Sequence, residues 1–456
     1  MPAALAVLTA LLLWPLACAG CEEDSGDVRR LEFWTLALKP HFDDYIEERI
    51  AAFEAEHPGV EVEWVDVSFD AVDRKLIASA AANRAPDVIN LSDRSFARFA
   101  SLGAMEDLNG LLPGDPGVRY LSGVLDIGRV GMGDGGPALR ALPWYLTTQA
   151  TLVNAEQLEN AGLRPERVAR DWAGLRAQAR AYHERTGRFL FSVPLGQESE
   201  LPWMMLADGI VPFEVENGRL VSRLNSPDVR GFIAEWVSLY EDGVLPREAA
   251  TTGHSHLIEL YQSGSLGLIV TGPNFLNRIR DVAPSVFEVT EVRPGITGTL
   301  GRQHVAVMVL GVTTQSRDPE LAAKLAWFMT GPESQNAFCR LATILPSTSE
   351  SLDDPFFSPD PTDVDDLGEA KLLTARGLSA SALRTAVAFT PALETWPDLR
   401  RAFEDGIKRT LLEGRPLDET LAAIDREWSR ILASAPPAGW DAVPRPGPAI
   451  AVTSSN

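Results

Sequence analysis

Few residues of this chain have the types and the spacing that catalysis or metal binding requires. His254 and His256 are separated by one residue, which can suit a metal ion, but the chain has six histidines and no cysteine near this pair. It contains no G-x-S-x-G motif, no P-loop, no H-E-x-x-H motif and no glycine-rich dinucleotide fingerprint after a strand. We therefore expect a protein that is not an enzyme, with no catalytic residues, no metal site and no cofactor.

The aromatic residues indicate sugar binding instead. A sugar site needs flat aromatic faces against the C–H surfaces of the sugar, and planar amide, carboxylate or guanidinium groups for its hydroxyls. Some of the eleven tryptophans lie inside helical patterns and are interpreted as core residues: Trp172, Trp236, Trp327 and Trp428. Five aromatic residues lie in loops or at strand ends and could face either a pocket or the core: Trp34, Trp144, Tyr145, Trp203 and Trp396.

The stretch from Leu31 to Leu91 predicts the elements that would position such a site. Leu31–Leu36 and Val88–Leu91 have the length and apolarity of strands, and residues 60–64 alternate between apolar and acidic. Two predicted helices lie between these strands, because apolar residues recur there at helical spacing: Ile46, Ile50 and Phe53 in the first, and Leu76 and Ala80 in the second. The resulting β-α-β-α-β order implies parallel strands with right-handed crossovers. Ligands bind beyond the carboxyl ends of such strands, so loops 35–42, 68–70 and 92–96 should face the site.

Several motifs resemble those of the extracellular solute-binding proteins of ABC importers, in particular the carbohydrate-binding family. They are a strand that ends in Trp34, the sequences AFEAEHPGVEVE and APDVINLSD, a Pro-Trp-Tyr run before a strand that ends at Asn154, and LYQSGSLGLIVTGPNF. The family's strand usually ends in Tyr-Asn, whereas this chain has Val153-Asn154. The pattern extends over residues 31–432. It implies an α/β, two-lobed periplasmic-binding-protein-like fold of type II, with a hinge and a ligand cleft between the lobes.

The resemblance also implies how the chain divides. Lobe one would comprise residues 28–139 plus 289–344, and lobe two would comprise residues 140–288 plus 345–434. The chain would cross between them near Arg140, Val289 and Leu345. Leu146–Val153 is predicted to be one strand, and the helices Asp398–Leu412 and Leu417–Leu432 are predicted to form a C-terminal pair on lobe two.

Further site residues follow from the resemblance. Asp93-Arg94 is similar to an Asp-Arg pair that contacts sugar in this family, although the same pair could form a salt bridge at a helix start. The predicted ligand-binding set is Trp34, Lys39, Asn90, Asp93, Arg94, Trp144, Tyr145, Glu198, Trp203, Gly272, Asn274, Phe275 and Trp396. We expect Trp144→Ala to weaken ligand binding without unfolding the protein.

The charge and the two ends of the chain constrain location and partners. A formal charge of −22 argues against nucleic-acid binding and fits either a self-repelling surface or a cationic ligand. Residues 1–20 are apolar and uncharged, as in a signal peptide, and Cys18-Ala19-Gly20-Cys21 resembles a lipobox that would place a lipid on Cys21. Residues 21–27 would form an acidic tether, and the residues 435–456 a disordered tail. Cys339 would be a buried small hydrophobe.

The sequence therefore predicts the substrate-binding component of an ABC importer. It would be an extracytoplasmic, lipid-anchored monomer in the periplasm or at the cell surface, and it would deliver a sugar or oligosaccharide to membrane permease subunits. Two alternatives stay open. One is a binding protein for a polyamine, metal ion or organic anion, with Asp43, Asp44, Asp93 and Glu198 as polyamine ligands. The other is a secreted glycoside hydrolase.

Overall fold

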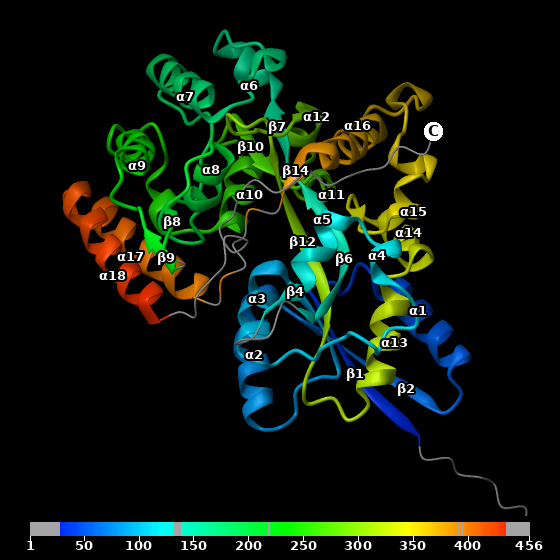
Figure 1. The fold of residues 1–456 in the computed structure, drawn as a ribbon. Helices are drawn as coiled ribbons and strands as arrows, with labels where there is room; N and C mark the ends of the chain where they lie inside the picture. Colours follow the sequence, from blue (N-terminus) through cyan, green and yellow to red (C-terminus); the bar gives the residue numbers. More distant parts are fainter. Residues whose placement is uncertain are drawn as a thin grey trace, which may run out of the picture.

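A computed structural model describes residues 28–434, except for 132–137, 218, 388, 390–392 and 394. The predicted signal peptide, the predicted lipidation site Cys21, the acidic tether and the C-terminal tail lie outside the described residues. The described part forms two α/β lobes, each with its own sheet, so the predicted fold class is confirmed (Figure 1). None of its helices is both long and apolar enough to span a membrane.

Lobe one is built on a mixed sheet. Its strands lie in the order β13 (Leu345–Pro346), β6 (Ala141–Thr148), β12 (Gln303–Val312), β3 (Val88–Ser92), β1 (Arg29–Leu36) and β2 (Val60–Val67), and β14 (Ala386–Val387) pairs with the start of β12. The strands β1, β2 and β3 are parallel, as predicted, whereas β12 runs antiparallel to β3 and β6 and parallel to β14. A two-stranded pair, β4 (Arg129–Val130) and β5 (Ala138–Leu139), lies beside them.

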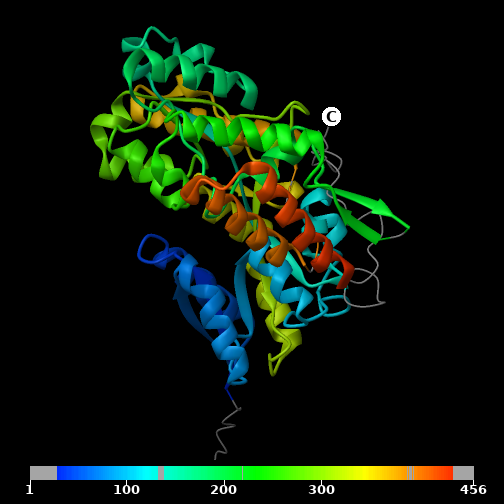
Figure 2. The same ribbon diagram turned by 90° about the vertical axis from the view of Figure 1, so that its left-hand side faces the viewer.

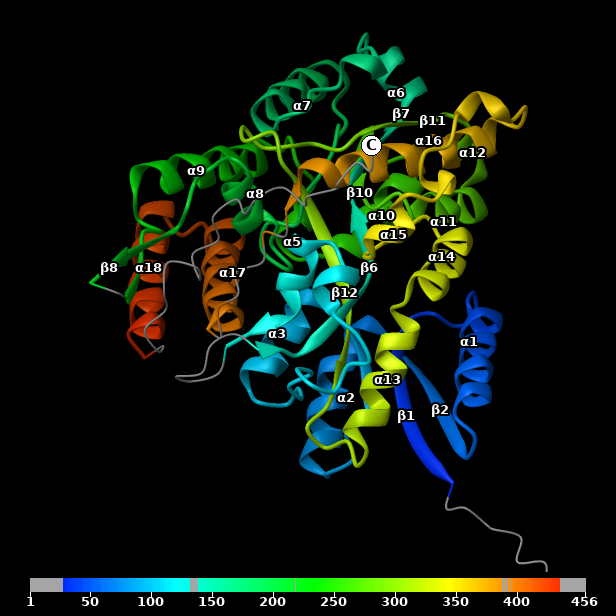
Figure 3. The same cartoon turned by 45° about the vertical axis from the view of Figure 1, so that its right-hand side comes forward.

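Helices cover both faces of this sheet. The chain moves from β1 outward to β2 and then back past β1 to β3, so right-handed crossovers place α1 (Asp43–Glu56) and α2 (Phe69–Ala81) on opposite faces (Figure 1). The remaining helices of this lobe are α3 (Asp93–Ser101), α4 (Pro116–Arg119), α5 (Ser122–Leu125), α13 (Pro319–Met329), α14 (Pro332–Leu341) and α15 (Ser349–Leu352). The carboxyl ends of β1, β2 and β3 point toward lobe two (Figure 3).

Lobe two has a smaller antiparallel sheet and more helix. Its strands are β10 (Leu268–Thr271), β7 (Ala150–Asn154) and β11 (Thr290–Pro294), with a separate hairpin of β8 (Phe213–Glu216) and β9 (Arg219–Ser222). Its helices are α6 (Ala155–Asn160), α7 (Trp172–Thr186), α8 (Leu201–Ala207), α9 (Pro227–Glu241), α10 (His254–Gln262), α11 (Phe275–Val282), α12 (Pro284–Glu288), α16 (Leu367–Ala382), α17 (Trp396–Glu413) and α18 (Leu417–Ser434). The α17–α18 pair forms one flank of this lobe (Figure 2).

The lobes meet where strands pass from one sheet to the other. The predicted strand Leu146–Val153 is in fact two strands, β6 and β7, which are separated at Gln149 and belong to different sheets. The chain returns between Gly295 and Gln303, whose side-chain amide donates to the Gln149 carbonyl oxygen at 2.9 Å. A Cβ on Gly295 would lie 2.4 Å from that same oxygen, so this crossing needs glycine.

Strand pairing also moves the expected lobe boundaries. We placed the crossings at Arg140, Val289 and Leu345, but β6 and β13 belong to the sheet of lobe one and β11 belongs to that of lobe two. Arg140 lies within lobe one, where its guanidinium donates to the carbonyl oxygen of Met105 at 2.8 Å. The crossings therefore lie near Gln149, in the segment 295–302, and after β13.

Candidate functional site

A small cavity lies where the two lobes meet. Arg94, at the start of α3 in lobe one, faces residues of α8 and α17 in lobe two across this cavity, whose full lining is Arg94, Ser199, Pro202, Trp203, His304, Phe389, Trp396 and Arg400. Three residues predicted from sequence therefore come together here: Arg94, Trp203 and Trp396. The cavity has a volume of about 20 Å³, which is enough for one water-sized group and far less than a sugar ring needs.

One wall of the cavity is a stack of aromatic rings. The Trp203 ring centroid lies 5.3 Å from that of His304 with 20° between the ring planes, and Phe389 lies nearly parallel to both rings. His304 reaches this position because the start of β12 pairs with β14, which sets His304 opposite Val387. Burial and then the charge of Arg94 lower the pKa of His304 to about 3, so the ring is neutral at physiological pH.

The opposite wall carries two guanidinium groups. Arg400 Nε donates to Glu404 Oε1 at 2.7 Å, and the same oxygen accepts from the backbone N–H of Ser199 at 3.1 Å. Burial and, after it, the charge of Arg94 lower the pKa of Arg400. Arg94 is exposed, and its backbone N–H donates to the carboxylate of Asp93, which is itself buried in the first turn of α3. The cavity thus combines aromatic surface with charged donors.

A second cluster on lobe two holds four more of the predicted residues. Gly272 and Asn274 follow β10, and a Cβ on Gly272 would lie 2.3 Å from Asn274 Oδ1, so the turn needs glycine. Glu198, held at φ +50°, accepts a hydrogen bond from the backbone N–H of His254 at 3.1 Å. The His254 ring lies 5.9 Å from the half-buried ring of Phe275.

The His254 ring is held by two further contacts. Its Nε2 lies 2.8 Å from Thr271 Oγ1, and its Nδ1 lies 3.5 Å from a carboxylate oxygen of Glu200. His256, by contrast, contacts Glu259 at 3.2 Å, so the two histidines have different partners. Among the described residues no three His, Cys, Asp or Glu side chains are grouped as metal ligands.

Three predicted aromatic residues lie in the core of lobe one rather than at a cleft surface. Trp144 is 0% exposed, and its ring packs against Phe33, Tyr145 and Phe338, so no face is left for a sugar. The structure thus places Trp144 as a core residue, which overturns the expected effect of Trp144→Ala. Tyr145 is also buried. Trp34 is buried beneath α2, where the Lys75 ammonium lies 4.1 Å from its ring centroid and its indole N–H donates to Glu32.

The remaining predicted residues of lobe one differ in accessibility. Asn90 is fully buried and donates to the carbonyl oxygen of Val309 at 3.1 Å within the sheet. Lys39 is exposed, and its ammonium lies 4.2 Å from the ring centroid of Trp64. Asp66 fixes the loop before Lys39, because its carboxylate accepts from Thr35 Oγ1 at 2.7 Å and from the Lys39 backbone N–H at 3.1 Å.

Sequence reasoning missed several residues near the site. His304, Phe389 and Arg400 lie in three separate segments, and no local motif joins them. Phe69 was not singled out either, although it lies in the loop 68–70 that we expected to face a ligand. Its side chain is 55% exposed at the start of α2, just beyond the carboxyl end of β2. An exposed aromatic residue at the end of a parallel strand was the available signal.

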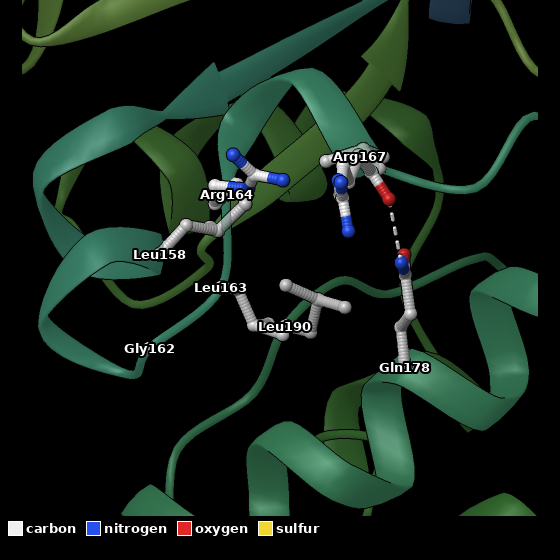
Figure 4. A pocket seen from close by; sticks show the side chains of 8 residues that line it. Leu158, Gly162, Leu163, Arg164, Arg167, Gln178 and Leu190 are labelled. Carbon is white, nitrogen blue, oxygen red and sulfur yellow. Dashed lines mark hydrogen bonds between the residues drawn. The ribbon is translucent and has the colours of Figure 1, made fainter.

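Two larger cavities lie outside the inter-lobe junction. One, of about 250 Å³, lies between α6 and α7 at the far end of lobe two, with leucines on one side and Arg164 and Arg167 on another (Figure 4). The side chain of Gln178 donates to the Arg167 carbonyl oxygen at 2.7 Å beside it. The other, of about 590 Å³, is the groove between α17 and α18. Neither contains a predicted site residue.

Comparison with known proteins agrees with this architecture. The family described as bacterial extracellular solute-binding proteins matches residues 48–364. The crystal structure of a candidate oligosaccharide periplasmic-binding protein from Synechococcus sp. MITs9220 is 35% identical, covers 89% of this chain and 100% of its own, and superposes with a TM-score of 0.79. The same protein has been solved in complex with zinc, with a TM-score of 0.81.

More distant relatives include a receptor of known structure and a lipoprotein. The GacH receptor of Streptomyces glaucescens, solved unliganded and in complex with acarbose, is 21% identical over 89% of this chain and 99% of its own, with a TM-score of 0.70. An uncharacterised lipoprotein of Streptomyces antibioticus is 26% identical over 354 residues, which are 76% of this chain and 77% of that protein. This chain belongs to the bacterial extracellular solute-binding protein family, which confirms the resemblance.

Proposed function

We propose that this protein is the substrate-binding component of an ABC importer, and that it binds a sugar or oligosaccharide between its two lobes. One observation carries the proposal: Arg94 of lobe one and Trp203 and Arg400 of lobe two line a single cavity at the lobe junction. Aromatic rings suit the C–H faces of a sugar, and guanidinium groups suit its oxygens. The sugar and oligosaccharide ligands named for the related structures support the same reading.

The lobe junction explains how solute binding would change the conformation that a permease recognises. A cavity of about 20 Å³ admits no whole sugar ring, so a ring would either lie at its mouth or require the lobes or the lining side chains to move apart. The crossings near Gln149 and Gly295 are the points at which such a rotation would occur. A solute that contacts both lobes stabilises the closed form by its extra contacts, and a permease that recognises that form would then receive the solute.

The location follows from the same proposal. The lipobox-like sequence before Cys21 would attach the chain to a membrane face, and a related Streptomyces protein is named a lipoprotein. A tether of residues 21–27 would then hold a monomeric binding domain beside the permease. Two arginines at the junction disfavour a cationic solute, so no observation supports the polyamine alternative.

A thermal-shift screen of the full chain tests the proposal. Neutral and acidic oligosaccharides, polyamines, amino acids and divalent metals would be compared, and a ligand at 100 times its Kd should add about 2.7 kcal/mol to the free energy of unfolding. We expect a stabilising sugar whose effect is lost in Trp203→Ala. Leu102→Ala, an exposed change on lobe one, is the control that should retain it. Stabilisation by polyamines or metals alone would contradict a sugar-binding role.

A further inference from the structure

The charge of the inter-lobe cavity is opposite to that of the protein as a whole. The chain carries a formal charge of −22, yet the only charged side chains lining this cavity within the described residues are Arg94 and Arg400. They come from different lobes, since Arg94 begins α3 and Arg400 lies in the second turn of α17. An acidic protein that brings two cations together at the junction of its lobes has a local preference for anions.

These two guanidinium groups are only partly neutralised by the protein. Arg400 is 18% exposed and bonds Glu404 through Nε, while no described residue accepts from its terminal nitrogens. Glu404 also accepts from the Ser199 backbone N–H, and Glu198 is occupied by the backbone N–H of His254. The Arg94 side chain has no hydrogen-bond partner among the described residues. With respect to the part of the chain that the structure describes, terminal nitrogens of both arginines are therefore available to a ligand.

The two arginines also act on one another. Burial lowers the pKa of Arg400 and the charge of Arg94 lowers it further, while Glu404 and Glu198 only partly compensate. Arg94 likewise disfavours the protonated form of His304, so the third polar group of the wall stays neutral. An anion between the two guanidinium groups would offset this repulsion.

The size of the cavity indicates which part of a ligand would enter it. A volume of about 20 Å³ fits a group the size of one water and excludes a pyranose ring. A carboxylate is small, planar and matched to guanidinium donors, and it could enter while the ring remained outside. Trp396 and Phe389 border the same cavity and could then contact the ring.

We propose that the solute is an acidic sugar, a uronic acid or an oligosaccharide that contains one, whose carboxylate binds between Arg94 and Arg400. This inference rests on the proposed function, because it assumes that the lobe junction is the sugar site. It adds the class of sugar and the two residues that select it. Because the two arginines belong to different lobes, a carboxylate bound to both of them would also hold the lobes together.

Isothermal titration of the full chain tests this inference with matched ligands. Galacturonate, glucuronate and mannuronate, as monosaccharides and trisaccharides, would each be compared with the methyl ester, which keeps the ring but removes the charge. We expect at least tenfold tighter binding of one acid than of its ester. The affinity of the acid should fall as NaCl is raised, because salt screens the attraction, and that of the ester should not.

Variants assign the effect to the two arginines. Arg94→Gln and Arg400→Gln should each weaken binding of the acid at least tenfold and weaken binding of the ester by a clearly smaller factor. Arg401→Gln is the matched control, because Arg401 is the next residue of α17, is exposed and pairs with Asp398 at 3.2 Å. Circular dichroism melting would establish that each variant is folded.

The outcomes separate this inference from the proposed function. An ester or a neutral oligosaccharide that binds as tightly as the acid would overturn the acidic-sugar assignment and leave sugar binding intact. Tight binding of a sulfated sugar in place of every uronate would overturn the carboxylate assignment. Acid binding that persists in both arginine variants would overturn the assigned residues. A chain that binds no sugar in the titration or in the thermal-shift screen would overturn the proposed function itself.

Discussion

The indole ring of Trp203 and the imidazole ring of His304 are stacked, with 5.3 Å between their centroids and 20° between their planes. Trp203 belongs to α8 of lobe two, whereas His304 lies at the start of β12, the strand that continues into the sheet of lobe one. This contact therefore joins the inter-lobe cavity to the first residues of β12. A neutral imidazole is needed there, because a buried charge without a counter-ion would be costly.

This burial predicts a pH-dependent stability. The pKa of His304 is about 3 in the folded protein and about 6.5 for an ordinary histidine, so between these values the unfolded chain binds a proton that the folded chain does not. Stability should therefore fall as the pH drops through this window, by up to about tenfold in the unfolding equilibrium per pH unit. Urea titrations of the wild type and His304→Phe from pH 4 to 7.5 would measure this difference.

The histidine variant has a matched control. His41 is exposed, so His41→Gln should reproduce the wild-type slope of stability against pH. His304→Phe keeps an aromatic ring in the stack and should show a shallower slope than the wild type. Parallel slopes in the wild type and His304→Phe would show that His304 does not titrate as described.

Trp144→Ala should destabilise the protein rather than weaken ligand binding alone. The indole is fully buried among Phe33, Tyr145 and Phe338, and removing such a side chain from a core costs about 3–5 kcal/mol. Urea unfolding would measure the loss. Leu102→Ala, at a side chain 67% exposed, should change stability by less than about 0.5 kcal/mol. A stable Trp144→Ala protein with reduced affinity would return Trp144 to the binding site.

Gly295→Ala should disturb the connection between the lobes. The new Cβ would lie 1.8 Å from the side-chain nitrogen of Gln303 and 2.4 Å from the carbonyl oxygen of Gln149, so the crossing segments must separate. We expect a loss of about 1–3 kcal/mol in the free energy of unfolding, as for other overpacked sites. Gly231→Ala, in an open position of α9, should instead stabilise by about 0.5–1 kcal/mol. Equal effects of the two changes would argue against a close approach at Gly295.

Cys339 should react with a thiol reagent only after unfolding. Its side chain is 1% exposed in α14, and burial raises the pKa of the thiol, which suppresses the reactive thiolate. In a chain with Cys18→Ser and Cys21→Ser, a chromogenic disulfide reagent should find no reactive thiol in buffer and one in concentrated denaturant. Rapid labelling of the native protein would show that the α14 region opens readily.

Local signals were sufficient for much of the fold. Trp172 lies in a helix, α7, as its helical pattern predicts, because Asp171 caps the start of that helix by accepting from the Gly174 N–H and Gly187 ends it at φ +66°. The β-α-β-α-β order from Leu31 to Leu91 is likewise confirmed, because each strand carries its own apolar pattern. These features depend on residues close together in the sequence.

The features that sequence could not show depend on distant partners. The strand-like segment Leu146–Val153 does not reveal a break at Gln149, because Leu146 and Thr148 before it and Ala150 after it are all buried, each side in its own sheet. Burial of Trp144 was hidden for the same reason, since β6 is paired on both edges and carries no charged residue that would mark an exposed face. The stack of Trp203, His304 and Phe389 joins three remote segments, so no spacing could predict it.

The interleaving of the lobes along the chain has a consequence for biogenesis. The core of lobe one includes Leu383 and Ala386 beside residues of β1 and β3, and the core of lobe two needs the helices α17 and α18. Neither core can be completed during synthesis of the chain, because the final quarter of the chain supplies residues to both cores. Such non-local contacts slow folding, so both lobes should complete their cores only after the whole chain has been synthesised.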